Sequence, residues 1–243
     1  MNNASFAPSL FEREVSGLQL LSSANSIKIP EVIYQSQVEG TSFLLLEYIE
    51  RGIPSINFWK AFGTELASLH KVTSLYFGLG SNNFIGSLPQ RNKPSDNWID
   101  FFINERLQPQ IDLALEQPVI DSNTISKFEK LYTKLPAIFP EEQPALIHGD
   151  LWNGNFLVGV NGRPVLFDPS VCYAHREMDL AMSQLFGGFD NLFYESYNDV
   201  FPLQKGFNQR VEIYQLFYLM VHVNLFGGGY LNAVKGILTR FVG

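Results

Sequence analysis

The sequence contains a single cysteine, Cys172, among its 243 residues. One cysteine excludes an internal disulfide and a zinc site built mainly of cysteines. Low cysteine usage is typical of reducing compartments, so the composition predicts a cytoplasmic protein. Cys172 itself is predicted to be a small buried apolar side chain, because no base that could activate a nucleophile stands beside it.

Long hydrophobic runs and export signals are also lacking. No stretch of 18 apolar residues occurs, and the best candidate, residues 213–226, is interrupted by Gln215, His222 and Asn224. The first eight residues are polar, and an acidic residue follows soon after them. We therefore expect no secretion signal, no membrane partner and a buried helix over 213–226.

Positive charge is scarce. The 17 lysines and arginines are outnumbered by 24 aspartates and glutamates, which gives a formal net charge of −7. A chain with this negative net charge lacks the basic surface that binds nucleic acid, so we expect no nucleic-acid partner. The densest basic group, Lys127, Lys130 and Lys134, is interpreted as the solvated face of a helix.

What is present is ordinary globular material, since 46% of the residues are hydrophobic. The spacing of apolar residues predicts a helix over 11–21. Two apolar stretches, 31–38 and 41–49, flank a Glu-Gly turn signal and predict a β-hairpin. The run Phe43-Leu44-Leu45-Leu46 predicts a strand buried on both faces. Everything after Gly52 and Pro54 is predicted to be mainly helical.

One stretch departs from the helical pattern. Residues 156–158 and 164–167 are apolar and flank Asn161-Gly162, which predicts a hairpin with a type I′ turn. Asp150 precedes the first strand and Asp168 follows the second. The hairpin is therefore expected to bring these two carboxylates close together.

Asp150, Asn155 and Asp168 form a set of hard oxygen ligands. An amide and a carboxylate suit Mg²⁺, and the second carboxylate is then free to accept a proton from a hydroxyl. Enzymes that transfer a phosphoryl group to an alcohol use one carboxylate as the base and other oxygen ligands to hold the metal. The segment H-G-D-L-W-N-G-N agrees in register with the protein-kinase pattern H-R-D-L-x-x-x-N, and Asp168 stands where the metal-binding aspartate of D-F-G would, although Pro169-Ser170 replaces Phe-Gly.

This segment, together with F-D-P-S-V-C-Y-A-H-R-E-M-D-L-A-M-S-Q-L-F-G-G-F further on, resembles the fructosamine kinase (ketosamine kinase) family. That family belongs to the aminoglycoside phosphotransferase and choline kinase branch of the protein-kinase-like fold. The resemblance implies an α+β fold of two lobes, with a partial β-rich lobe over 1–50 and a helical lobe over 51–243. It implies an enzyme that uses ATP and Mg²⁺ to phosphorylate a sugar hydroxyl of ketosamines, small or protein-bound, in deglycation repair.

The resemblance also implies roles for the loop residues. Asp150 matches the catalytic base, and Asn155 and Asp168 match the two Mg²⁺ ligands. His148 matches a structural histidine of the catalytic loop. Asp179 matches a buried aspartate that braces this loop from the following helix.

Nucleotide contacts are implied nearer the N-terminus. Glu47, Tyr48 and Ile49 match the hinge between the lobes, whose backbone groups hydrogen-bond adenine. Glu14 lies where a helix glutamate pairs with the phosphate-binding lysine.

Substrate contacts are implied around the loop and on the penultimate helix. Trp152 is expected to stack on the sugar or its amine-bearing substituent, with packing as the alternative. His222 and Asn224 are candidate walls of the substrate pocket, or else partners of other side chains. His175 and Arg176 either contact substrate or brace the loop after Asp168, and bracing is slightly favoured.

One departure from the family pattern is large. Kinases carry a Gly-rich loop and a strand lysine upstream of the helix glutamate, yet no Lys or Gly precedes Glu14. We expect a misplaced start or a truncated gene product, with weak ATP binding, negligible activity and a tendency to associate. The alternatives left open are a kinase of aminoglycosides, choline or other amino alcohols, and an inactive pseudo-kinase. A hydrolase that uses a metal at His148 and Asp150 is more distant.

Overall fold

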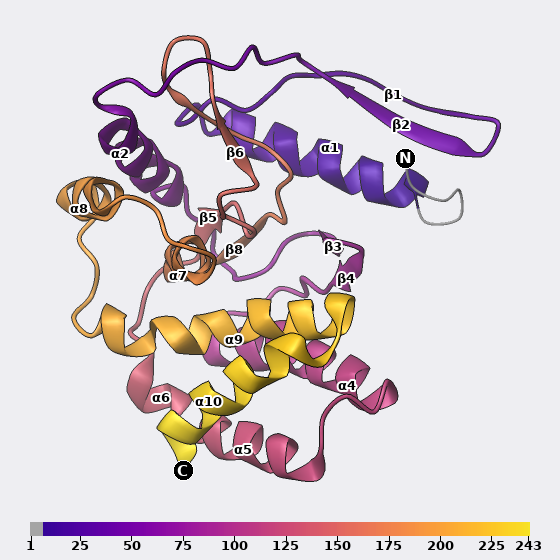
Figure 1. Cartoon of the computed structure of the whole chain (residues 1–243), viewed down its shortest axis with the longest axis vertical. Helices are drawn as coiled ribbons and strands as arrows, with labels where there is room; N and C mark the ends of the chain where they lie inside the picture. The colour runs from indigo at the N-terminus through magenta and orange to yellow at the C-terminus, as the bar shows by residue number, and fades with distance from the viewer. Residues whose placement is uncertain (1–6) are drawn as a thin grey trace.

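The computed structural model of the chain describes residues 7–243. Many helices and a few short antiparallel strands make up the described part, which is the α+β composition that the sequence predicts. Figure 1 shows one helix and a long strand pair at one end of the molecule and the C-terminal helices at the other. The segments between these ends carry most of the predicted site residues.

The N-terminal part consists of α1 (Ala7–Ser23), β1 (Val32–Val38) and β2 (Thr41–Leu46). The two strands pair antiparallel. Glu39 and Gly40 turn the chain between them, with φ values of 48° and 77°. Helix α1 packs against both strands. The predicted helix and hairpin are therefore confirmed.

The expected burial of β2 on both faces is wrong. Leu44 and Leu46 are only half-buried, whereas Phe43 and Leu45 are 38% and 51% exposed. Tyr34, which pairs with Leu45 across the hairpin, is exposed as well. Among the described residues β1 and β2 form a sheet of two strands. Its one face lies toward α1, and its other face leaves these apolar side chains in contact with solvent.

The rest of the chain is mainly helical, as predicted. The long α9 and the helices around it form the lower part of the view in Figure 1. The helices and turns that follow β2 are α2 (Phe58–His70), α3 (Trp98–Phe101), the π-helical turn η1 (Phe102–Leu107), α4 (Gln108–Glu116), α5 (Ser122–Tyr132), α6 (Leu135–Ile138), α7 (Glu177–Leu185), α8 (Asn191–Val200), α9 (Phe207–Phe226), the 3₁₀ turn η2 (Gly228–Tyr230) and α10 (Leu231–Val242).

Six short strands form three further antiparallel pairs. The pairs are β3 (Asn83–Ile85) with β4 (Leu88–Gln90), β5 (Ala145–Ile147) with β8 (Cys172–Ala174), and β6 (Phe156–Val158) with β7 (Pro164–Leu166). The β6–β7 pair is the predicted hairpin, and Phe156 lies opposite Leu166 in it.

The turn of this hairpin differs from the predicted type I′. Gly162 N–H donates to Gly159 C=O at 2.8 Å, so Val160 and Asn161 are the central residues. Gly162 takes the left-handed φ of 71°, and Asn161 is not among the residues with positive φ. Gly159 N–H then donates to Arg163 C=O at 2.9 Å. A turn followed by one left-handed glycine is the three-residue hairpin loop, which serves the strand twist as well as a type I′ turn does.

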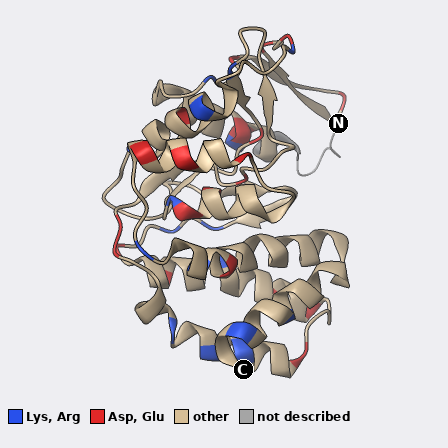
Figure 2. Ribbon diagram, turned by 60° about the vertical axis from the view of Figure 1, so that its left-hand side comes forward, with Lys and Arg blue, Asp and Glu red and all other residues tan. Residues whose placement is uncertain are grey.

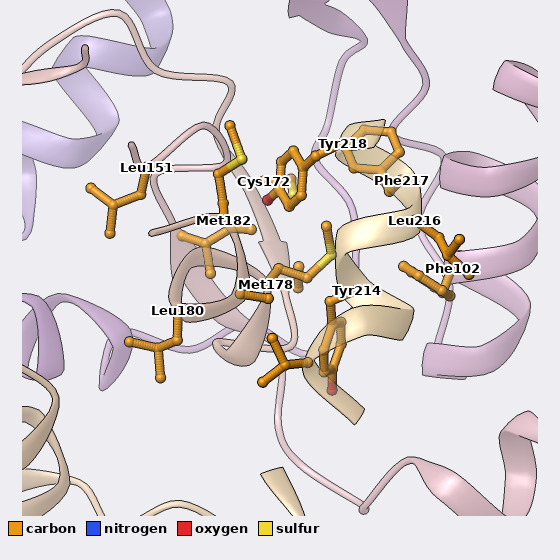
Figure 3. Packing of buried hydrophobic residues seen from close by; sticks show 14 of the residues in the cluster. Phe102, Leu151, Cys172, Met178, Leu180, Met182, Tyr214, Leu216, Phe217 and Tyr218 are labelled. Carbon is orange, nitrogen blue, oxygen red and sulfur yellow. The ribbon is translucent and has the colours of Figure 1, made fainter. Parts of the chain in front are cut away.

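The core lies where α7 packs against α9. Met178 and Met182 of α7 and Tyr218 of α9 are fully buried there together with Cys172. Leu151, inside the H-G-D-L segment, is buried too, and Figure 3 shows it among these side chains. The segment that carries Asp150 is thus anchored in the hydrophobic core through Leu151.

Helix α9 is buried on almost all sides, as its apolar sequence predicts. Every residue from Ile213 to Val221 is buried. A helix that is apolar all round needs a buried position. Within residues 7–243, no helix combines the length and hydropathy needed to cross a membrane.

The basic group on α5 is tied to the C-terminal helix. Lys127 Nζ donates to Thr239 Oγ1 at 2.8 Å, and Lys134 Nζ donates to Phe241 C=O at 2.7 Å. Figure 2 shows the remaining lysines and arginines dispersed among acidic residues. These lysines therefore serve helix packing in addition to solvation.

Candidate active site

The segment from His148 to Asn155 follows β5, and Asp179 of α7 holds its first residues by hydrogen bonds. The two carboxylate oxygens of Asp179 accept hydrogen bonds from the backbone amides of His148 and Gly149, at 2.7 and 2.8 Å. Asp179 is fully buried. Charge-assisted hydrogen bonds of this kind are strong in a dry environment. They fix the backbone immediately before Asp150, which is the bracing geometry that the family resemblance implies.

The His148 side chain is a support of the loop. It is fully buried, its Nε2 lies 3.0 Å from Phe167 C=O, and its Nδ1 lies 3.3 Å from the backbone nitrogen of Asp150. Burial lowers the pKa of His148, although Asp179 and the contact with Phe167 oppose the shift. The neutral ring therefore joins the two ends of the hairpin unit.

Gly149 is required by this geometry. Its φ of 83° lies in the left-handed region that favours glycine. A Cβ atom placed there would lie 2.0 Å from Ser170 C=O. No other residue type fits this position without moving the chain after Asp168.

Asn155 is the centre of the polar site. Its Nδ2 donates to Asp150 Oδ2 and to Asp150 C=O, both at 2.9 Å, and to Asp168 C=O at 3.3 Å. The hairpin register causes this meeting, because Phe167 N–H donates to Asn155 C=O at 3.1 Å. Asp168 has a φ of 54°, a strained value that aspartate tolerates better than most residues. The three residues predicted from the sequence to converge therefore do so.

Negative charge accumulates at this point. Burial and the nearby Asp168 charge raise the pKa of Asp150 to about 7, against the effect of the Asn155 hydrogen bond. Burial and Asp168 also raise the pKa of Glu14 to about 7. Glu14 on α1 is thus close enough to sense the Asp168 charge.

The three carboxylates share one small cavity. Glu14, Asp150 and Asp168 line it together with Arg13 and Ser170. Three acidic groups face a single guanidinium here, so one more cation would relieve their repulsion. The Asp168 and Asp150 carboxylates and the Asn155 amide are oxygen donors of the type that Mg²⁺ takes. The residues present therefore fit a magnesium ion.

A second cavity opens on the other side of Asp150. Trp152 and His222, two of the predicted substrate residues, line it together with Ile85 and Tyr218. The Trp152 indole is 37% exposed. His222 Nδ1 bonds to Tyr218 C=O at 2.8 Å, and partial burial lowers the pKa of His222.

Further aromatic rings pack around His222 at the wall of this cavity. The Phe186 ring lies 4.7 Å from the His222 ring and 6.1 Å from the Trp152 indole. Tyr230 lies 5.0 Å from His222 and Phe226 lies 5.5 Å from it, both as distances between ring centres. The sequence pattern gave no separate signal for Phe186 or Tyr230, since isolated aromatic residues are mostly core residues.

The structure does not bring Asn224 to this cavity. Its Nδ2 donates to the backbone carbonyl and the side-chain oxygen of Gln110, at 2.9 and 2.8 Å. Of the two alternatives left open for Asn224, this geometry favours pairing with another side chain over a place in the wall of the substrate pocket. The bond to Gln110 joins α9 to α4.

Glu47, Tyr48 and Ile49 form an extended segment between β2 and α2. Glu47 N–H donates to Glu31 C=O at 2.8 Å. The Glu47 carboxylate accepts from Lys28 Nζ at 2.6 Å and from Glu31 N–H at 3.0 Å, and these bonds lower the pKa of Glu47. The Tyr48 ring is 86% exposed. The amide and the carboxylate of Glu47 are therefore both engaged within the chain.

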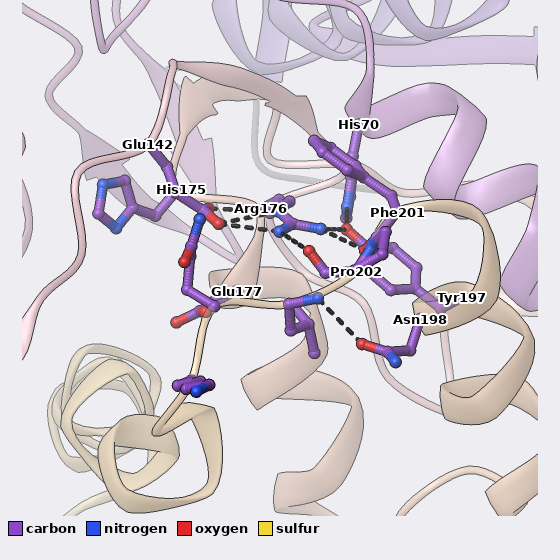
Figure 4. Close-up of polar contacts among 12 residues, drawn as sticks. His70, Glu142, His175, Arg176, Glu177, Tyr197, Asn198, Phe201 and Pro202 are labelled. Carbon is purple, nitrogen blue, oxygen red and sulfur yellow. Dashed lines mark hydrogen bonds and ion pairs between the residues drawn. The ribbon is translucent and has the colours of Figure 1, made fainter.

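Arg176 lies away from the acidic cavity and braces the structure. Its guanidinium donates to Glu142 at 2.9 Å and to the carbonyls of Phe201 and Pro202 at 2.6 and 2.7 Å (Figure 4). It also lies 3.7 Å above the Phe201 ring. With its donors engaged in this way, Arg176 holds the start of α7 to the segment after α8.

His175 is a core residue rather than a substrate contact. It is fully buried and its ring stacks on Trp98 at 4.2 Å. Its Nδ1 lies 3.0 Å from the Tyr214 hydroxyl, while its Nε2 is buried without a partner in the described residues. Burial lowers the pKa of His175 well below its ordinary value, with help from Arg210 and Arg176.

Sequence reasoning missed two supports of the site. His70 of α2 joins Asp179 Oδ2 at 3.2 Å to the Tyr197 hydroxyl at 2.8 Å. Gln90 donates to Ser170 C=O at 3.0 Å and to Asn83 Oδ1 at 2.9 Å, which steadies the chain after Asp168. A histidine on the buried face of an amphipathic helix was the available signal for His70, whereas the β3–β4 carboxamides offered none.

Comparison with known proteins agrees with this geometry. The profile of the fructosamine kinase family matches residues 1–243. The protein named "Probable ketoamine kinase" of Enterococcus faecium is 39% identical over 233 residues, which are 95% of this chain and 82% of that protein. The protein named "Protein-ribulosamine 3-kinase, chloroplastic" of Arabidopsis thaliana is 36% identical over 245 residues, which are 99% of this chain and 74% of that protein.

Solved structures share the fold. The crystal structure of a candidate fructosamine-3-kinase from Haemophilus somnus superposes with a TM-score of 0.90 at 28% identity, over 100% of this chain and 82% of that one. A thermostable mutant of an aminoglycoside phosphotransferase gives a TM-score of 0.62 at 16% identity, over 97% and 85% of the two chains. The predicted kinase-like fold is thus confirmed. The chain belongs to the fructosamine kinase family of ATP-dependent phosphotransferases, which phosphorylate ketosamines.

Proposed function

We propose that this chain transfers the γ-phosphoryl group of ATP, with Mg²⁺, to a sugar hydroxyl of a fructosamine- or ribulosamine-type adduct. The observation that carries this proposal is the position of Asp150. It lines both the acidic cavity with Asp168 and the aromatic cavity with Trp152. A group that faces a metal-binding site on one side and an acceptor site on the other is where phosphoryl transfer takes place.

We assign Asp150 as the general base that accepts the proton of the sugar hydroxyl. Its Oδ2 is oriented by Asn155 Nδ2 at 2.9 Å, and Asp179 fixes the backbone before it. The sugar hydroxyl oxygen forms the new bond to the γ-phosphorus, ADP leaves, and the hydroxyl proton passes to Asp150. A carboxylate whose pKa is raised toward neutrality is a better proton acceptor than an ordinary aspartate.

Asp168 and Asn155 are assigned as the magnesium ligands. Mg²⁺ bound there neutralises charge on the phosphates, which is the main catalytic contribution in phosphoryl transfer. Glu14 adds a third carboxylate to the same cavity. The backbone of Glu47, Tyr48 and Ile49 is proposed to hold adenine, at the junction of a lobe over 1–50 and a lobe over 51–243.

Trp152 and His222 are assigned to the ketosamine. The aromatic rings around their cavity can stack on the sugar, and their faces attract the ammonium group that links sugar to carrier. The names of the related ketoamine and ribulosamine kinases support this class of acceptor. Cations of aminoglycosides and of choline could use the same rings, so they are the acceptors to be compared.

An acceptor panel tests the proposal. The purified chain is incubated with radiolabelled ATP and Mg²⁺ and with a fructosamine- or ribulosamine-bearing lysine, an aminoglycoside, or choline. Turnover is expected to be slow, with label entering the ketosamines at least about tenfold faster than the others. Equal or faster labelling of an aminoglycoside or of choline would contradict the acceptor class. Label in none of them would favour the inactive pseudo-kinase.

A further inference from the structure

A groove outside the two Asp150 cavities lies between α7, α8 and the start of α9. Its volume is about 880 Å³, the size of a ligand site. Figure 1 shows α7 and α8 nearly end-on, with the first turns of α9 below them. We call it the α7–α8 groove and define it by the polar side chains that line it. They include the carboxylate of Glu195 and the carboxamides of Gln184, Asn191, Asn198, Gln204, Asn208 and Gln209.

The chemistry of the α7–α8 groove favours peptide groups. Its six carboxamides each offer a donor and an acceptor, which match the C=O and N–H of a peptide bond. Within residues 7–243, Asn198 is the only one of these six side chains that hydrogen-bonds, and its Oδ1 accepts from Leu203 N–H at 2.9 Å. Phe189, Tyr194 and Phe207 add apolar surface between them.

The charge of the groove selects a cation. Glu195 is exposed and makes no ion pair with the described part of the chain. No lysine or arginine is among the described residues that line the groove. A phosphate or a nucleic acid would meet a carboxylate and no cation, whereas a lysine or arginine side chain would find a counter-ion.

One loop connects the groove to the acceptor cavity. The Phe186 ring packs 4.7 Å from the ring of His222, which lines the acceptor cavity. The next residues, from Gly187 to Phe189, line the groove. Asn153, the neighbour of Trp152, donates to Phe186 C=O at 3.4 Å. A ligand in the groove therefore lies against the same loop that contacts His222 of the acceptor cavity and Asn153.

We propose that the α7–α8 groove binds the polypeptide next to a ketosamine-bearing lysine, with a basic side chain of that polypeptide at Glu195. This inference rests on the proposed function, and it makes a protein-borne ketosamine the substrate that the chain binds best. The sugar and its ammonium group occupy the Asp150 cavity, and the flanking chain occupies the groove.

Labelled peptides test this directly by fluorescence anisotropy. The probes are a short fluorescein-labelled peptide with one ketosamine-bearing lysine and two flanking arginines, the same peptide without the sugar, and a sugar-free version with glutamates as flanks. The proteins are the parental chain, Glu195→Lys, Glu195→Gln and, as a matched control, Glu129→Lys. Glu129 is also an exposed helix residue but lies on α5, outside the groove.

The sugar-free, arginine-flanked peptide is expected to bind the parental chain and Glu129→Lys equally. Its affinity should fall about tenfold in Glu195→Lys and by less in Glu195→Gln, and the glutamate-flanked peptide should bind the parental chain as weakly. No binding of the arginine-flanked peptide, or equal binding by Glu195→Lys, would overturn the groove proposal. If the sugar-bearing peptide binds no tighter than the sugar-free one, the proposed function fails instead.

Discussion

Asp179 holds the backbone of His148 through a hydrogen bond of 2.7 Å from the amide nitrogen to Oδ2. The same carboxylate takes the Gly149 amide on its other oxygen and the His70 ring at 3.2 Å. A single buried side chain thus joins α7, α2 and the loop that carries Asp150. The position of Asp150 therefore depends on a group that need not touch substrate.

Replacing Asp179 with Asn tests this support. An amide has one acceptor oxygen, so at least one of the two backbone N–H groups loses its partner. We expect the free energy of unfolding to fall by about 1–3 kcal/mol, and kcat to fall with it. Chemical denaturation and turnover assays measure both. Asp199→Asn is the control, because Asp199 is exposed on α8; equal losses in the two variants would contradict the assignment.

Replacing Asp150 with Asn tests the base. The amide keeps the size of the side chain but cannot accept the hydroxyl proton. We expect kcat to fall by about 10²-fold or more relative to the parental chain, while the affinity for Mg·ATP changes little. Steady-state kinetics and calorimetry give the two quantities. A variant that retains more than half of the parental kcat would refute the role of Asp150.

Replacing Asp168 with Asn tests the metal site. Asparagine tolerates the left-handed backbone found at Asp168, so the fold should survive the change. Loss of the carboxylate charge should greatly weaken the Mg²⁺-dependent part of nucleotide binding, because a neutral amide oxygen is a poorer ligand for Mg²⁺. Titration of ATP with and without Mg²⁺ is the measurement, and Asn155→Ala should give a partial loss. Unchanged affinity and unchanged metal dependence in Asp168→Asn would remove Asp168 from the site.

Local patterns predicted the centre of the site well. The register of the β6–β7 hairpin follows from two apolar runs and a short turn, and it alone brings Asn155 beside Asp168. The turn type was wrong, yet the pairing was right, because a three-residue loop with one left-handed glycine also suits strand twist.

The burial and the partners of several residues depend on long-range packing and could not be predicted from the sequence. Phe43 and Leu45 were expected to be buried, but burial requires a partner for each face, and β-strand composition does not name one. Asn224 could equally have served substrate or scaffold, and only the approach of α4 to α9 gives it Gln110. His70 supports Asp179 from a helix more than a hundred residues earlier in the sequence.

The exposed face of the β1–β2 hairpin predicts self-association. Tyr34, Phe43 and Leu45 present apolar surface, and within the described residues neither strand has a further neighbour. Such edges pair readily with other chains. We expect light scattering of the parental chain to show concentration-dependent association, and Leu45→Lys to reduce it. Leu75→Lys, at an exposed leucine outside the hairpin, should leave it unchanged; a monodisperse parental chain would contradict the prediction.

The buried His175 predicts a loss of stability on mild acidification. Its pKa in the folded chain lies well below the ordinary value of about 6.5, chiefly because of burial. As the pH falls below about 6.5, His175 binds a proton in the unfolded chain but not in the folded chain. The free energy of unfolding should therefore decrease by up to about 1.4 kcal/mol per pH unit for this histidine, and the stability is regained above pH 6.5.

Denaturant unfolding between pH 7.5 and 5.5 measures this slope. His175→Phe keeps an aromatic ring against Trp98 but cannot titrate, so its slope should be shallower than that of the parental chain. Tyr214→Phe is the matched control, because it breaks the bond between Tyr214 and His175 and leaves the imidazole in place. That control should lose stability at every pH and keep the parental slope. If His175→Phe retains the full slope, the acid sensitivity comes from other groups, such as His148, whose pKa burial also lowers.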